Sequence, residues 1–128
     1  MKRLHIRRIG WADLSPFKGL APLKSLECFG NRLTTLAKLP SLKSLDCSMN
    51  GLATLEPLSG VSSLQFLACW CNQLTSLAGL ERLFPLQLLN CSQNQITMLE
   101  PLAGLGSLQS LNVWGNPNKE SFRKAHPA

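Results

Sequence analysis

The sequence lacks long hydrophobic runs and has few residues suited to acid–base chemistry. No stretch approaches the roughly 18 unbroken apolar residues of a membrane-spanning helix, so we expect no membrane segment. The two histidines, His5 and His126, lie near opposite ends of the chain. A Cys–His nucleophilic pair needs both side chains together. We therefore expect no enzyme, and we expect no cofactor.

Paired metal-ligand motifs are also absent. Zinc sites built on two C-x₂₋₄-C pairs have a recognisable spacing, and the five cysteines do not follow it. Cys69 and Cys71 are close in sequence but have no partner cluster, and Cys71 has no histidine near it in sequence to activate its thiol. We therefore predict no metal site and no catalytic thiol.

The amino-terminal segment resembles the basic start of a signal peptide but lacks its apolar core. Arg7 and Arg8 interrupt the hydrophobic region that such a peptide needs. We therefore expect no signal peptide and a cytoplasmic location. The net charge is +6, and five of the basic residues fall within residues 1–18. This basic end could attract a nucleic acid or an acidic protein, although a solvated, solubilising end is the plainer interpretation.

The sequence does contain a strong internal repeat marked by asparagine. Asn31, Asn50, Asn72, Asn94 and Asn116 are separated by 19, 22, 22 and 22 residues. Periods of about 20–29 residues with regularly placed leucines are typical of repeat architectures in which each unit stacks on the next.

Each repeat follows the pattern L1-x-x-L4-x-L6-x-x-N9-x-L11-x-x-L14-x-x-L17, where the numbers are positions in the repeat. The spacing of two between positions 4 and 6 predicts a short strand with both side chains on one face. The spacing of three after position 11 predicts 3₁₀ or tight helical turns. Because one repeat cannot bury its leucines alone, we predict a solenoid with a parallel sheet.

We predict one domain over residues 1–128. Residues 1–22 are expected to form a degenerate capping repeat with Leu4 at position 1 and Ile9 at position 6, residues 23–115 the repeats, and residues 116–128 a carboxyl-terminal cap. The interval from Leu39 to Leu42 lacks the segment that holds Val61, Leu83 and Leu105 in the later repeats.

Four cysteines share position 6 of successive repeats, and Val113 follows them there. They are Cys28, Cys47, Cys69 and Cys91. Free cysteine behaves as a small buried hydrophobe, and its exchange for valine in the last repeat favours a packing role. The asparagines are expected to pair with backbone groups that the turns leave unsatisfied.

These residues, Leu-x-x-Leu-x-(Cys/Val)-x-x-Asn-x-(Leu/Ile), resemble the leucine-rich repeat family. The 22-residue spacing is similar to that of the internalin-like and phosphatase-regulator-like class, and cysteine at position 6 is similar to bacterial members. The resemblance implies an α/β solenoid: a right-handed horseshoe segment with a concave parallel sheet and a convex side of 3₁₀ or short helical turns. It also implies a protein-binding module.

Outward-facing strand positions 3, 5 and 7 are the candidate binding surface. Large apolar side chains at such positions have no core to enter and mark interaction surfaces. The predicted partner-binding residues are Phe29, Phe66, Trp70, Leu88, Trp114, Glu27 and Asp46. We expect the rings at position 7 to lie about 10 Å apart across serine-floored notches. The alternative is that these rings fold over the asparagine corner and shield it.

The sequence therefore predicts a monomeric, non-enzymatic protein that binds a protein partner on its concave face, as a regulator, an inhibitor or a toxin-immunity partner. The alternative is binding of a nucleic acid or an acidic partner by the basic amino-terminal end. No basic stripe with interleaved aromatic residues runs along the concave positions, which disfavours nucleic acid.

Overall fold

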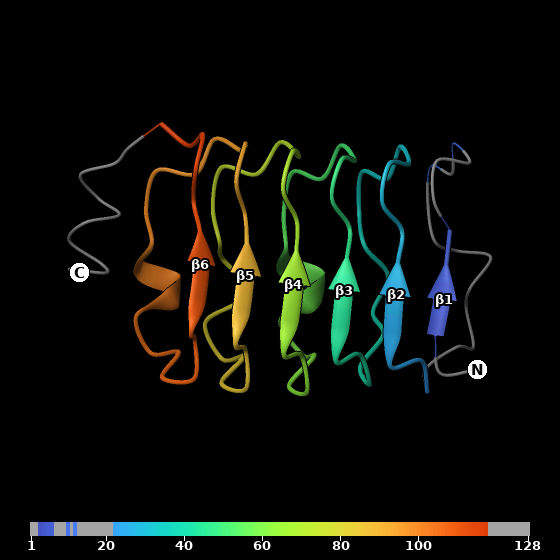
Figure 1. Cartoon of the computed structure of the whole chain (residues 1–128), viewed down its shortest axis with the longest axis horizontal. Coiled ribbons are helices and arrows are strands. Elements are labelled where there is room, and N and C mark those ends of the chain that lie inside the picture. The colour runs from blue at the N-terminus through green and yellow to red at the C-terminus, as the bar shows by residue number, and fades with distance from the viewer. Residues whose placement is uncertain (1–2, 7–9, 11, 13–21, 118–128) are drawn as a thin grey trace.

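The computed structural model describes residues 3–6, 10, 12 and 22–117, and these build a stack of repeats. Six parallel strands pair in chain order in one sheet (Figure 1). The strands are β1 (Arg3–His5), β2 (Ser25–Glu27), β3 (Ser44–Asp46), β4 (Phe66–Ala68), β5 (Leu88–Asn90) and β6 (Ser110–Asn112). Each has three residues because the inward leucine and its two outward neighbours are all that one repeat contributes.

The register aligns equivalent positions of successive repeats. Leu45 of β3 pairs with Leu26 of β2 and with Leu67 of β4. The central leucines of β2 to β5 are buried, whereas Leu111 of β6 is only partly buried. Alternation along the strand places one side chain inward and its neighbours outward, so the register sends every leucine of the pattern into the core.

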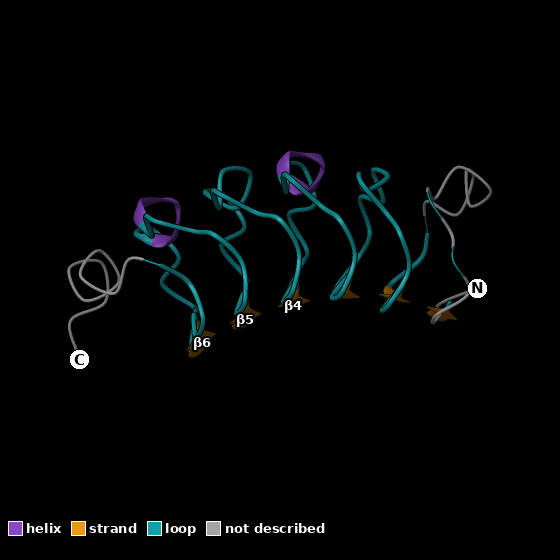
Figure 2. Cartoon of the chain, turned by 90° about the horizontal axis from the view of Figure 1, so that it is seen from above, coloured by secondary structure: helices purple, strands orange, loops and turns teal. Residues whose placement is uncertain are grey.

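The chain returns behind the sheet through short turns and two 3₁₀ helices, η2 (Glu56–Leu58) and η3 (Glu100–Leu102). Both have the sequence Glu-Pro-Leu, and proline suits the first turn because it has no N–H to leave unpaired. The sheet curves so that its exposed face is concave and the 3₁₀ helices lie on the convex side (Figure 2).

Gly79 takes the corresponding place in the third full repeat, where no 3₁₀ helix forms. Its φ of +107° is left-handed, and a Cβ built there would lie 2.6 Å from the Leu55 carbonyl oxygen. A larger residue would collide with the preceding repeat. Glycine is therefore required by a close backbone approach as well as by its conformation.

The core is one continuous cluster of leucine, cysteine, isoleucine and valine side chains. Val61, Leu83 and Leu105 are buried in it. The shorter repeat lacks the corresponding residue, and a hollow of about 200 Å³ lies where this repeat meets the next. It is lined by Lys38, Pro40, Pro57, Ser59, Gly60 and Val61.

The position assigned to Leu4 was wrong. β1 pairs Leu4 with Leu26, so Leu4 occupies position 4 rather than position 1, and buried Ile6 occupies position 6. The interval between Leu4 and Leu26 is 22 residues, not 19. The alternation Arg3-Leu4-His5-Ile6 is a strand signal, and it places Leu4 at position 4 in agreement with the 22-residue period.

The parallel strands and the 3₁₀ turns confirm the predicted solenoid. Residues 118–128 of the predicted carboxyl-terminal cap lie outside the described residues. In the part of the chain that the structure describes, no helix has the length and apolar character needed to cross a membrane.

Candidate functional site: the concave face

The asparagines form a ladder that holds the corners of neighbouring repeats together. The amide nitrogen of Asn72 donates to the carbonyls of Cys47, 3.1 Å away, and Cys69, 3.0 Å away. Its oxygen accepts from the N–H groups of Leu52 at 3.0 Å and Asn50 at 3.2 Å. The same pairings recur at Asn50 and Asn94. These side chains satisfy buried backbone groups, so they stabilise the corner.

The cysteines at position 6 form a second, buried ladder directly behind the sheet. Burial raises the pKa of the Cys28 thiol to about 12, and the nearby Asp46 carboxylate adds to the shift. Burial raises the pKa of Cys91 to about 12 as well. The pKa values of Cys47 and Cys69 are raised well above the ordinary value, first by burial and then by neighbouring thiols. Neutral thiols are poor nucleophiles, which agrees with a packing role.

Cys71 lies outside this ladder, at position 8. The backbone at position 8 has a left-handed conformation in five successive repeats. The φ angle is 55° at Met49, 56° at Cys71 and 54° at Gln93, and glycine occupies the position at Gly30 and Gly115. Residues other than glycine are uncommon there. The position is dictated by the turn into the asparagine corner, so Cys71 is a turn residue whose side chain is partly exposed.

The seven predicted partner-binding residues all lie at outward positions of the sheet or directly after its strands. Phe66 and Leu88 occupy paired positions of β4 and β5 and are 41% and 38% exposed. Trp114 follows β6 and is 69% exposed. Phe29, Trp70, Glu27 and Asp46 are partly buried. Among these seven residues, the exposed apolar side chains are therefore those on β4 and β5 and directly after β6.

Position 5 has a structural task that the sequence pattern did not reveal. The carboxylate of Asp46 accepts the N–H of Ser48 at 3.1 Å. Asn90 and Asn112 use their side-chain oxygens in the same way, two residues further along the chain, at 3.2 and 3.0 Å. Such turns are typical of Asp and Asn. The Asp46 carboxylate thus stabilises its own corner.

Ala68 cannot make this turn, and a neighbouring repeat compensates. The hydroxyl of Ser48 accepts the N–H of Trp70 at 3.2 Å. Serine at position 7 was expected to floor a notch between rings. It is instead fully buried and bonded to the next repeat.

The predicted spacing of the rings at position 7 was wrong for the first pair. The ring centroids of Phe29 and Trp70 lie 5.4 Å apart at an interplanar angle of 56°. The two rings lean together over Ser48, because contact between aromatic side chains is favourable and the small serine leaves room. No open notch remains there, and Trp70 is partly a packing residue.

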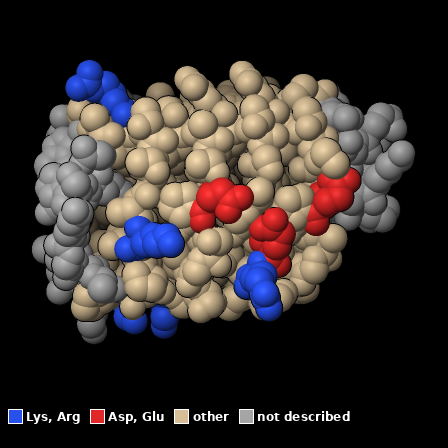
Figure 3. Space-filling model, turned by 180° about the vertical axis from the view of Figure 1, so that it is seen from behind, with Lys and Arg blue, Asp and Glu red and all other residues tan. Residues whose placement is uncertain are grey.

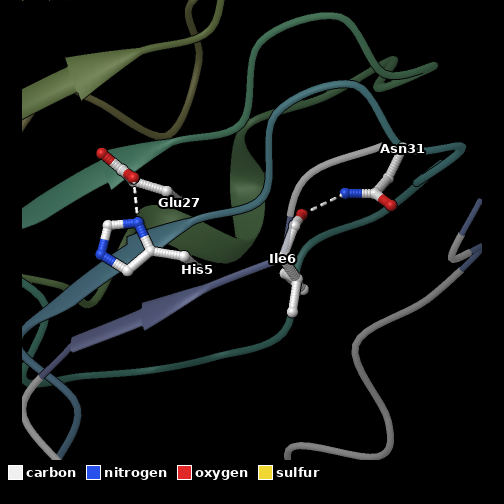
Figure 4. A network of polar contacts seen from close by, with 4 residues as sticks. All are labelled: His5, Ile6, Glu27 and Asn31. Atoms are coloured by element: carbon white, nitrogen blue, oxygen red, sulfur yellow. Dashed lines mark hydrogen bonds and ion pairs between the residues drawn. The ribbon is translucent and has the colours of Figure 1, made fainter. Parts of the chain in front are cut away.

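His5 and Glu27 meet on β1 and β2, which the sequence assignment missed. The strand register aligns them, and the imidazole Nδ1 contacts the Glu27 carboxylate (Figure 4). Nearby, the Asn31 amide donates to the Ile6 carbonyl at 2.6 Å, which joins β1 to the ladder. Alternation at Arg3 to Ile6 was the signal that could have placed His5 on the concave face.

The convex side carries acidic side chains in its return segments (Figure 3). Glu56 and Glu100 begin the 3₁₀ helices, and the Glu81 carboxylate accepts the N–H of Gly79 at 2.7 Å. Within the described residues no group of three or more His, Cys, Asp or Glu side chains could hold a metal ion.

No protein-family model and no curated protein sequence matches the chain. Solved structures do. A crystal structure of internalin C2 (inlC2) from Listeria monocytogenes superimposes with a TM-score of 0.75 at 25% identity, over 100% of this chain and 68% of that chain. Internalin inlF from the same organism gives a TM-score of 0.69 at 23% identity over 85% of this chain.

The chain spans only 39% of the length of the inlF structure. At these identities the likeness establishes the fold, and the fold is that of the internalin leucine-rich repeats. It supports the leucine-rich repeat family.

Proposed function

We propose that this leucine-rich repeat solenoid, of the 22-residue internalin-like class with a bacterial-type cysteine, is a non-enzymatic module that binds a protein partner on its concave face. The main support for the proposal is the pair Phe66 and Leu88, which face outward on adjacent strands and are 41% and 38% exposed. Exposed apolar side chains gathered in one patch mark interaction surfaces. A cytoplasmic regulator, inhibitor or toxin-immunity partner would use the surface in this way.

The test is affinity capture of proteins from an extract of the native cell. The binding-face variant combines Phe66→Ser and Leu88→Ser, because Ser25, Ser44 and Ser110 show that serine fits position 3. The matched control combines Phe84→Ser and Met98→Ser, which are 54% and 53% exposed but lie outside the strands.

Wild type and control should retain the same partner, and the binding-face variant should lose it by about tenfold or more, as expected for buried apolar anchors. Equal retention by both variants would contradict the proposal. Nucleic-acid binding is less favoured, because the described lysine and arginine side chains at concave positions, Arg3, Lys24 and Lys43, all lie beside β1 to β3, and the positions beside β4 to β6 carry none.

A further inference from the structure

Charge is unevenly distributed along the repeats. Among residues 59–117 only Glu81, Arg82 and Glu100 carry charge, and all three lie in return segments. The concave surface of β4 to β6 is therefore uncharged. We call it the neutral half: Gln65, Gln87 and Gln109 at position 2, Phe66, Leu88 and Ser110 at position 3, and Ala68, Asn90 and Asn112 at position 5.

The strand register orders these side chains into rows that cross the strands. Phe66 pairs with Leu88, and Leu88 pairs with Ser110. Neighbouring strands lie about 4.8 Å apart, so Phe66 and Leu88 form a continuous apolar ridge. The glutamine row runs along one side of the ridge, and the row that contains Asn90 runs along the other.

The amide groups beside the ridge have unused hydrogen-bonding capacity. Across the described part of the chain, the side chains of Gln65, Gln87 and Gln109 have no hydrogen-bond partner. Asn90 and Asn112 use their side-chain oxygens in their own turns, which leaves their NH₂ groups as donors. The ridge is thus bordered by donors on both sides and by acceptors on one.

This arrangement selects against charge in a bound segment. A Lys, Arg, Asp or Glu side chain pressed onto the neutral half would lose hydration and meet no opposite charge, which is costly. Peptide groups and the side chains of Ser, Thr, Asn and Gln can instead pair with the free amides. An apolar side chain can cover Phe66 and Leu88.

We infer that the neutral half binds an uncharged polypeptide segment of the partner, with a large apolar side chain on the ridge and peptide or amide groups on the flanking rows. The inference rests on the proposed function, since it specifies the chemistry of a partner on the same face. The mixed charges of β1 to β3, which include Glu27 and Asp46, contact a different part of that partner and orient it.

The probe is a display library of short random peptides, panned on the full chain. Recovered peptides should be rich in large apolar and amide or hydroxyl residues and poor in charged ones. Their binding should fall about tenfold or more with the Phe66→Ser/Leu88→Ser variant. It should change little between about 50 and about 500 mM NaCl, because no ion pairs are involved.

A charge swap between the two halves sharpens the test. Gln87→Lys places on the neutral half the residue that Lys24 and Lys43 already carry at position 2, so the fold tolerates it. It should weaken the selected peptides about tenfold. The reciprocal control, Lys43→Gln, should leave their binding unchanged.

Two results contradict the inference in different ways. Peptides that depend on Phe66 and Leu88 but are rich in charged residues and dissociate in salt would overturn the uncharged partner and leave the proposed function standing. A selection that yields no peptide dependent on this pair would overturn the inference, whereas equal capture of the protein partner by wild type and the Phe66→Ser/Leu88→Ser variant would overturn the proposed function itself. Thermal unfolding of each variant is measured alongside, so that a folding defect is not taken for lost binding.

Discussion

The two halves of the concave face share one backbone and differ in chemistry. In β1 to β3, which we call the charged half, the outward positions carry Arg3, His5, Glu27 and Asp46, whereas in β4 to β6 they carry no charge. The strands nevertheless pair in one register throughout the sheet. The same inward leucines support both surfaces, so the solenoid constrains the core and leaves position 3 free to vary.

Residue identity can vary less at positions 5 and 7 than at position 3, because side chains there bond to backbone N–H groups. Asp46 in the charged half and Asn90 in the neutral half make the same turn with different charge. The hydroxyl of Ser48, which follows β3, accepts the N–H of Trp70, which follows β4. The two halves therefore differ in charge but are joined by hydrogen bonds between their repeats. The following experiments test the shared core, the contact between the halves and the side chains of each half.

The largest expected effect concerns the thiol ladder, which runs through both halves. Folding raises the pKa of Cys28 and Cys91 from the ordinary value of 9.0 to about 12, and those of Cys47 and Cys69 well above it. Above pH 9 the unfolded chain loses thiol protons that the folded chain keeps, so stability falls as pH rises. The loss is about 1.4 kcal/mol per thiol per pH unit.

Urea unfolding at pH 8 and pH 10 measures this loss, which should total about 5 kcal/mol for the four thiols. Lysine titration also contributes in this range, so a variant isolates the thiol part. Cys91→Val copies Val113 and should remove about a quarter of the loss while leaving stability at neutral pH nearly unchanged. An unchanged pH dependence in this variant would contradict the assignment.

Gly79→Ala should disrupt the stacking of the β4 repeat, the first repeat of the neutral half, on the β3 repeat of the charged half. The new Cβ would lie 2.6 Å from the Leu55 carbonyl oxygen, and φ is +107°. Backbone atoms cannot move aside cheaply, so we expect a loss of about 3 kcal/mol or more of unfolding free energy. Gly60→Ala is the control, because nothing lies within 4 Å of its Cβ position. Equal stabilities would refute the close approach.

The inward-facing side chains were predictable from the sequence, because leucine, cysteine and asparagine recur at fixed positions. Only one way of stacking the repeats buries all of these side chains. The register of β1 was predictable too, because the alternation Arg3-Leu4-His5-Ile6 and the 22-residue period both place Leu4 at position 4, but the 19-residue spacing of the next interval led to the wrong assignment. The Phe29–Trp70 contact was missed for another reason. A repeat position fixes the direction of the Cα–Cβ bond, but the tilt of a ring depends on the neighbouring Ser48.

Asn72→Ala tests the joint between the halves. Its side chain connects the carbonyl of Cys47 beside β3 to that of Cys69 beside β4, and it accepts the N–H of Leu52 at 3.0 Å. Removing it leaves buried backbone groups unpaired, and we expect a loss of about 1–3 kcal/mol. Asn112→Ala is the milder comparison, because that side chain makes one exposed bond to Trp114. Unchanged thermal stability in Asn72→Ala would contradict the ladder.

The smallest expected effect separates two tryptophans that the repeat pattern treats as equivalent. Trp70 lies against Phe29 across the boundary between the halves, whereas Trp114 is 69% exposed. Aromatic pairs contribute about 0.5–1.5 kcal/mol beyond area burial, so Trp70→Ala should lower the unfolding free energy by about 1 kcal/mol or more. Trp114→Ala should change it by less than about 0.5 kcal/mol, as expected at an exposed site. Equal losses in urea titrations would mean that Trp114 packs as Trp70 does. Stability kept in Trp114→Ala together with lost partner binding would make it the better probe of recognition.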